Sequence, residues 1–170
     1  MTIVSKSLTE LLQEIEGQEC IFEDTLNPEE SPDTFVDVSA IGGGSVRIPN
    51  GEYRGELMKK ISPEFKPTGY TWVAPPSYDS CLTEMLINAF ERGKPPVTIK
   101  LFRGQKGHVL RLEDSGEGFN HEELVAEMRA GSEEFYQRNG GGLRTFDRKP
   151  YQISYEGNGN VINMQILTGQ

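Results

Sequence analysis

Apolar residues recur along the chain at two spacings, one typical of helices and the other of strands. Spacings of three and four residues predict helices over residues 8–15, 52–61, 76–92 and 121–130. Strict alternation of apolar and polar residues predicts strands over residues 45–49, 97–103, 109–112, 151–155 and 162–166.

Glycine-containing turns join two pairs of these strands. Residues 104–107 connect the strands at 97–103 and 109–112, and residues 156–160 connect the last two strands. Helices interleaved with two antiparallel hairpins predict an α+β fold. The expected architecture is a two-layer α/β sandwich, in which a mixed, mostly antiparallel sheet is covered by helices on one face.

The composition favours a globular protein. The chain has 170 residues, of which 35% are hydrophobic and 25% are charged, enough for one domain with its own core. No apolar run approaches the ~20 residues that span a bilayer, and no secretory signal is recognisable. The two cysteines, Cys20 and Cys81, are too few for a disulfide scaffold. A cytoplasmic location is therefore expected.

The negative charge is concentrated at the start of the chain. Ten acidic residues and one basic residue occur up to Asp37, so this segment carries the whole net charge of −9. The balanced remainder argues against direct binding of nucleic acid. We therefore expect residues 1–40 to be an acidic arm with one short amphipathic helix, and residues 41–170 to be the functional domain. The arm is interpreted either as a solvated appendage or as a docking segment for a partner.

Glu84 and Asn88 lie four residues apart in the helix predicted over residues 76–92. At 100° per residue their side chains share a stripe beside the apolar face, with Arg92 nearby. Alone, such a pair is typical of a solvated helix edge. If the two side chains face one pocket, Asn88 can supply an amide oxygen to Mg²⁺, and Glu84 can orient or deprotonate an attacking hydroxyl.

Two glycine-rich segments follow this helix. In the first, Asp114 can accept a hydrogen bond from the exocyclic amine of adenine, while Gly116 and Gly118 let the backbone lie close to a flat base. In the second, three glycines at 140–142 precede a short helix predicted at 143–148, where backbone N–H groups can face phosphates. Each segment alone is typical of a turn, but together they predict an adenine-nucleotide site.

The segment between the two glycine-rich stretches has no clear periodicity. Residues 131–139 are therefore expected to form a lid that becomes more ordered when a nucleotide binds. Arg129 and Arg138 are the candidates for contacting phosphate, and a surface ion pair is the alternative for each of them.

The three motifs, in this order, resemble those of the GHKL (Bergerat-fold) ATPases, most closely the anti-sigma-factor serine kinases. Glu84, Asn88 and Arg92 match the N-box of that branch. The two glycine boxes are matched by Asp114, Gly116, Gly118, Gly140, Gly142 and Leu143. The similarity extends over about residues 45–167.

The resemblance implies Mg-ATP as the cofactor, with Glu84 as general base, Asn88 as magnesium ligand and Asp114 as adenine contact. It also implies protein partners: a STAS-type antagonist that is phosphorylated on serine, a sigma factor, or both. Neither a nucleic acid nor a membrane is expected as a direct partner, and a homodimer remains an open alternative to a monomer.

Three functions fit these expectations. The first is a serine/threonine protein kinase of the anti-sigma type. The second is a nucleotide-gated module that binds a partner and transfers nothing. The third is a detached histidine-kinase catalytic domain whose phosphoacceptor lies on another protein.

Overall fold

A computed structural model describes residues 3–40, 44–63, 78–131 and 151–168 of the chain. The helices are α1 (Leu8–Glu14), the 3-10 turn η1 (Pro32–Thr34), α2 (Gly51–Ile61), α3 (Tyr78–Glu91) and α4 (His121–Ala130). The strands are β1 (Glu19–Leu26), β2 (Phe35–Ala40), β3 (Gly44–Pro49), β4 (Val97–Arg103), β5 (Gly107–Glu113), β6 (Tyr151–Glu156) and β7 (Val161–Leu167). Most of the predicted lid and the helix predicted at 143–148 lie outside the described residues.

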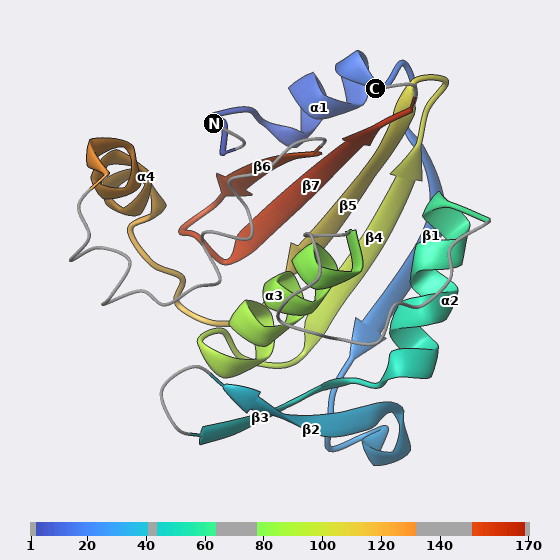
Figure 1. Cartoon of the computed structure of the whole chain (residues 1–170), viewed down its shortest axis with the longest axis vertical. Coiled ribbons are helices and arrows are strands. Elements are labelled where there is room, and N and C mark those ends of the chain that lie inside the picture. Colours follow the sequence, from blue (N-terminus) through green and yellow to red (C-terminus); the bar gives the residue numbers. More distant parts are fainter. Residues whose placement is uncertain (1–2, 41–43, 64–77, 132–150, 169–170) are drawn as a thin grey trace.

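The main sheet has five strands in the order β1-β4-β5-β7-β6, and each neighbouring pair is antiparallel. A single parallel bridge between Ile3 and Ile153 adds the N-terminal segment beside β6. Strands β2 and β3 form a separate two-stranded sheet. Figure 1 shows this hairpin at one end of the molecule, below α3. The predicted α+β class with a mixed, mostly antiparallel sheet is therefore confirmed.

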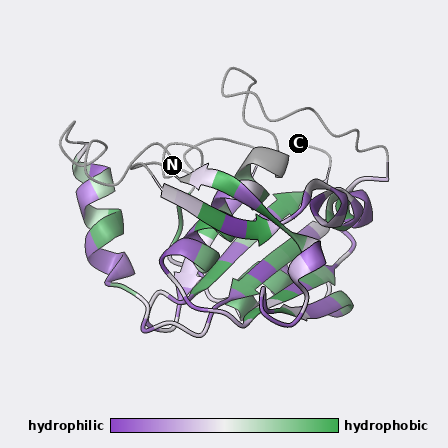
Figure 2. Ribbon diagram, turned by 90° about the horizontal axis from the view of Figure 1, so that it is seen from below, coloured by the Kyte–Doolittle hydropathy of each residue, from purple (hydrophilic) through white to green (hydrophobic). Residues whose placement is uncertain are grey.

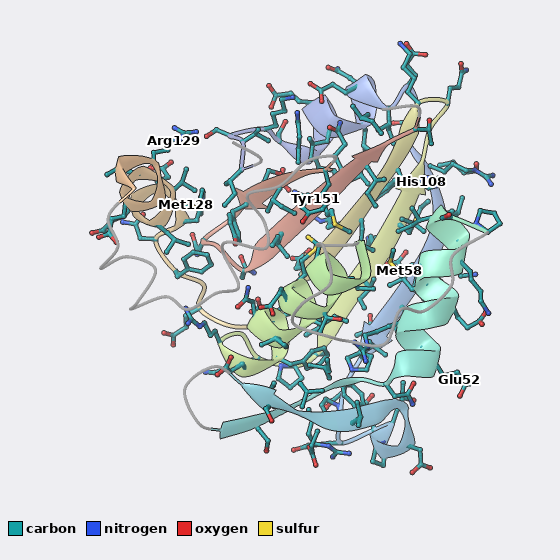
Figure 3. All side chains as sticks on the ribbon, in the orientation of Figure 1. Glu52, Met58, His108, Met128, Arg129 and Tyr151 are labelled. Carbon is teal, nitrogen blue, oxygen red and sulfur yellow. The ribbon has the colours of Figure 1, made fainter. Side chains whose placement is uncertain are left out.

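The core lies mainly between the sheet and two helices. Alternate strand residues such as Ile99, Leu110 and Met164 form one buried cluster with residues of α2 and α3. Figure 2 shows hydrophobic and hydrophilic residues interleaved along the strands, as this arrangement requires. Figure 3 shows Met58 directed from α2 towards the sheet and Glu52 directed away from it.

Helix α1 packs against the opposite face of the sheet. Leu11 and Ile15 are fully buried there against Val109 of β5, whose neighbour Leu110 faces the main core. The pleat explains this division, because successive residues of a strand point to opposite faces. Helices α2 and α3 cover one face of the sheet, as predicted. Helix α1 covers part of the opposite face, which the prediction left uncovered.

Side-chain caps explain where the helices begin. Ser7 and Glu10 form the capping box that their spacing predicts at the start of α1. Asn50 caps α2 and Asn120 caps α4, each accepting a backbone N–H from the third residue of its helix. Gly131 ends α4 in a left-handed conformation. Within the described ranges, no helix is both long enough and apolar enough to cross a lipid bilayer.

The structure differs from the expectation that residues 1–40 are a separate arm. Strand β1 is an edge strand of the main sheet and pairs with β4 along its whole length. Leu26 is buried in the main core. Four acids of this segment also pair with bases from later strands and turns: Glu16 with Lys106, Glu19 with Arg103, Glu23 with Lys100 and Asp37 with Arg47.

A bulge explains why β1 is not visible in the sequence pattern. The register of β1 against β4 shifts between Cys20 and Phe22, so one extra residue interrupts the alternation of apolar and polar positions. Exposed ion pairs each contribute little to stability. The backbone ladder with β4 is therefore the stronger link between the acidic segment and the rest of the fold.

Candidate functional site

A cavity of about 430 Å³ lies beside the C-terminal half of α3. The ends of β5, β6 and β7, the loop leading into α4 and one side of α4 itself complete its described walls. Four of the predicted site residues line it: Asn88, Arg92, Asp114 and Gly118. The structure thus brings two predicted residues from the end of α3 and two from the loop after β5 to one concave site, whose volume is within the range of small-molecule sites.

Asp114 is held in place by backbone groups on both sides. Its Oδ1 accepts the N–H of Gly116 at 2.7 Å, and its own N–H donates to the carbonyl oxygen of Asn160 at 3.0 Å. Burial raises the pKa of Asp114 above its usual value, and hydrogen bonds from the backbone of Gly116 and Lys94 partly offset this effect. The carboxylate is therefore a fixed, partly desolvated acceptor at the wall of the cavity.

Two glycines make the close packing around Asp114 and the following loop geometrically feasible. A Cβ at Gly93 would lie 2.6 Å from Asp114 Oδ1, and closer still to Asp114 Cγ and the carbonyl oxygen of Ala89. Gly118 has φ of +77°, and a Cβ there would overlap the carbonyl oxygen of Asn158. Any larger residue at these positions would displace the loop or the carboxylate.

The remaining cavity lining combines apolar and aromatic residues with the polar residues Asn120, Glu123 and Glu127. Met85, Leu112 and Ile162 line it from three elements. Phe119 also lines it, is 42% exposed, and meets the ring of Tyr155 edge-on with 5.3 Å between centroids. Burial raises the pKa of Tyr155, so its hydroxyl stays protonated at neutral pH. The apolar part of this lining suits a flat apolar ring with a hydrogen-bond donor directed at Asp114.

The turn between β6 and β7 contributes to the cavity lining and is hydrogen-bonded to the loop after β5. The carbonyl oxygen of Asn158 accepts the N–H of Phe119 at 2.6 Å. The amide of Asn160 donates to the carbonyl oxygen of Asp114 at 3.2 Å. Both Asn160 and Tyr155 line the cavity, yet neither was predicted as a site residue. Their spacing in the sequence gives no signal, because only the pairing of β5 with β7 brings the turn to Asp114.

Glu84 lies on α3 one turn before Asn88, and the structure places it differently from Asn88. Its residue is 6% exposed, and it does not belong to the described lining of the cavity. The thiol of Cys81 lies one turn earlier on the same helix. Burial raises the pKa of this thiol, a hydrogen bond with Tyr151 lowers it, and the nearby Glu84 carboxylate raises it further. Figure 3 shows Tyr151 beside α3. Glu84 therefore belongs to the buried side of the helix.

The other predicted residues have separate positions. Gly116 lies behind Asp114, against Gly93, rather than on the cavity lining. Arg129 lines a second cavity, of about 550 Å³, between α4 and residues 3–7, and Figure 3 shows it extending from α4 towards that segment. Predicted residues outside the described part of the chain are Arg138, Gly140, Gly142 and Leu143.

Within the part of the chain that the structure describes, no group of three or more His, Cys, Asp or Glu side chains is arranged to hold a metal ion. Comparisons of the chain with protein-family models, with curated proteins and with solved structures find no match.

Proposed function

We propose that this chain binds Mg-ATP in the cavity beside α3 and acts as a regulatory serine/threonine protein kinase of the anti-sigma type. The observation that carries the proposal is the meeting of Asn88, Arg92, Asp114 and Gly118 on one cavity. Their types and order are those that the resemblance to GHKL ATPases implies for nucleotide binding.

The cavity lining fits an adenine ring. Asp114 offers a carboxylate oxygen to the exocyclic amine, which guanine lacks at that place. Such a hydrogen bond to a charged group contributes about 1.5–3 kcal/mol. Met85, Leu112 and Ile162 offer apolar surface to the ring faces. Backbone hydrogen bonds from Gly116 and Lys94 favour the charged form of Asp114 and partly offset the rise in its pKa that burial causes.

The donors near the C-terminal end of α3 fit a magnesium-bound triphosphate. Mg²⁺ is commonly held by one or two protein oxygens together with phosphate oxygens and waters, and Asn88 supplies one carboxamide oxygen. Arg92 adds a guanidinium one helical turn further along, where it can face a phosphate. The bound metal would neutralise phosphate charge, and this chain's residues would orient the nucleotide beside α3.

Phosphoryl transfer also requires a base close to the attacking hydroxyl. Glu84 is the proposed base, since residues four apart on a helix are neighbours on its surface. A nucleotide-gated binding module that transfers nothing is the second candidate. The burial of Glu84 away from the described cavity lining favours this candidate, since a buried carboxylate has limited access to a protein hydroxyl.

Protein partners follow from the same proposal. A STAS-type antagonist is the proposed phosphoacceptor, and a sigma factor is the proposed second partner. A cytoplasmic location is proposed on the same ground.

Thermal unfolding with nucleotides tests the binding step. Mg-ATP at 100 times its dissociation constant should stabilise the fold by about 2.7 kcal/mol. At about 2–4 °C per kcal/mol for a chain of this size, the midpoint should rise by roughly 5–11 °C. Mg-GTP at the same concentration should give a much smaller shift. An equal shift with GTP, or none with ATP, contradicts the adenine-binding role of Asp114.

A transfer assay separates the two candidate functions. Radiolabelled ATP is incubated with the protein and with candidate STAS-type proteins, and label on serine or threonine is measured. Labelling supports the kinase. ATP binding without labelling of any partner supports the nucleotide-gated module.

A further inference from the structure

The last residue of β6, Glu156, connects two parts of the molecule on opposite faces of the sheet. Its neighbour Tyr155 faces the main core and lines the nucleotide cavity, whereas Glu156 points to the face that α1 covers. Glu156 Oε1 accepts the N–H of Leu8, the first residue of α1, at 2.6 Å. One side chain therefore ties the start of α1 to the strand end beside the cavity.

A polar network holds the Glu156 carboxylate in position. Its other oxygen pairs with Arg111 and accepts the amide of Asn163 at 3.3 Å. Asn163 is fully buried, and the Arg111 and Glu156 side chains are 18% and 23% exposed. Burial alone would raise the pKa of Glu156, but the hydrogen bonds from Leu8, Arg111 and Asn163 outweigh it and lower the pKa.

The four residues after Glu156 form the turn that supports the first glycine box. Through its backbone carbonyls this turn accepts the N–H of Asp114, the first residue of the box, and the N–H of Phe119, the residue after Gly118. Asn160 adds a side-chain hydrogen bond to Asp114. A shift of Glu156 would therefore move the acceptors that position Asp114 at the cavity.

We propose that Glu156 is a positioning residue that couples α1 to the nucleotide cavity through the turn at 157–160. The N-terminal segment thereby regulates the site: when the bond between Leu8 and Glu156 is present, Asp114 is held for adenine, and when it is absent, the turn loosens. The regulatory part of this inference rests on the proposed nucleotide binding. The structural coupling stands on the contacts alone.

Leu8→Pro removes the relevant donor selectively. Leu8 occupies the first position of α1, where proline is tolerated because its φ suits a helix and the missing N–H has no partner within the helix. Ser7 has φ of −73° and ψ of 161°, an extended conformation compatible with a following proline. Leu8→Ala is the control, since it also removes the leucine side chain that packs against the cluster around α1 but keeps the N–H.

Glu156→Gln provides an independent variant. Its single carbonyl oxygen cannot serve Leu8, Arg111 and Asn163 together. If both changes act through one link, the double variant should be no more impaired than the more impaired single variant.

Amide hydrogen exchange measured by NMR is the decisive readout, since it requires no nucleotide. In Leu8→Pro and in Glu156→Gln, the N–H groups of Asp114 and Phe119 should exchange about 5- to 10-fold faster, comparable to weakening one hydrogen bond. Amides of the β1–β4 ladder, on the far side of the sheet, should exchange as in wild type. Wild-type rates at both amides in Leu8→Pro, or the same acceleration in Leu8→Ala, overturn the coupling.

Nucleotide affinity then tests the regulatory part. Leu8→Pro should bind Mg-ATP about 5-fold more weakly, at the low end of typical coupling between sites, with Leu8→Ala within about 2-fold of wild type. Unchanged affinity in Leu8→Pro overturns the regulation. If wild type binds no ATP, the proposed function fails and the regulation with it, whereas the exchange rates still decide the structural coupling.

Discussion

Gly93 lies where the end of α3 meets the carboxylate of Asp114, and replacing it with alanine tests how tightly that carboxylate is positioned. The new methyl group would lie 2.6 Å from Asp114 Oδ1, and closer to Asp114 Cγ and to the carbonyl oxygen of Ala89. The backbone carbonyl cannot move without disturbing α3, so the Asp114 side chain must turn away. It would then lose its hydrogen bond from Gly116.

The expected losses follow from this geometry. Overpacking typically costs about 1–3 kcal/mol, which for a chain of this size lowers the unfolding midpoint by roughly 2–12 °C. The contact between Asp114 and adenine contributes about 1.5–3 kcal/mol, so Gly93→Ala should weaken ATP binding by roughly 10- to 150-fold. Calorimetry with Mg-ATP and a thermal melt of each variant measure the two effects.

Gly55→Ala is the matched control. Gly55 is buried in α2, and no atom lies within 4 Å of the position that its Cβ would take. The substitution should stabilise the fold by about 0.5–1 kcal/mol, since glycine is unfavourable within a helix, and leave ATP affinity unchanged. If Gly93→Ala binds ATP as tightly as wild type, Asp114 does not need this position to hold the base, and the reasoning is refuted.

Three further predictions concern the other groups. Asn88→Ala should weaken binding of Mg-ATP by roughly 10-fold but leave binding of ATP in EDTA unchanged; equal losses in both titrations would rule out a metal ligand. Glu84→Gln should keep ATP affinity but lower phosphate transfer by roughly 10²–10⁴-fold, and transfer at the wild-type rate would exclude Glu84 as the base. The pKa of Glu156 is lowered by folding from its ordinary 4.5, so its stabilisation is fully present above that pH and is lost as the pH falls through the lower folded value. Glu156→Gln should therefore lose less stability between about pH 6 and pH 3 than wild type; denaturant unfolding at both pH values that gives equal losses would contradict this.

Much of the fold is predictable from the sequence because its periodicities are clear. Strands β4 to β7 and helices α1, α2 and α4 occur where the spacing of apolar residues predicts them. Strand β1 was missed, because its bulge between Cys20 and Phe22 breaks the alternation and its many acidic residues suggest a solvated segment.

The candidate site was predictable only where its residues share one local element. Arg92 follows the last residue of α3, one turn after Asn88, and Asp114 and Gly118 lie in one loop, so spacing alone links the members of each pair. Tyr155 and Asn160 join them only through the pairing of β5, β6 and β7, which depends on the whole sheet. Helical spacing likewise predicts that Glu84 lies on the same side of α3 as Asn88. It does not predict that Glu84 is buried, because burial depends on which residues pack against α3.

Calorimetric titration of wild type and Asp114→Asn with Mg-ATP and Mg-GTP tests the central claim most directly. Glu113→Gln is the control, because it removes a neighbouring carboxylate that does not line the cavity. The account predicts that wild type and Glu113→Gln bind ATP much more tightly than GTP. Asp114→Asn should lose roughly 10- to 150-fold in ATP affinity, equivalent to about 1.5–3 kcal/mol. Equal affinity of wild type for the two nucleotides, or unchanged ATP affinity in Asp114→Asn, would contradict it.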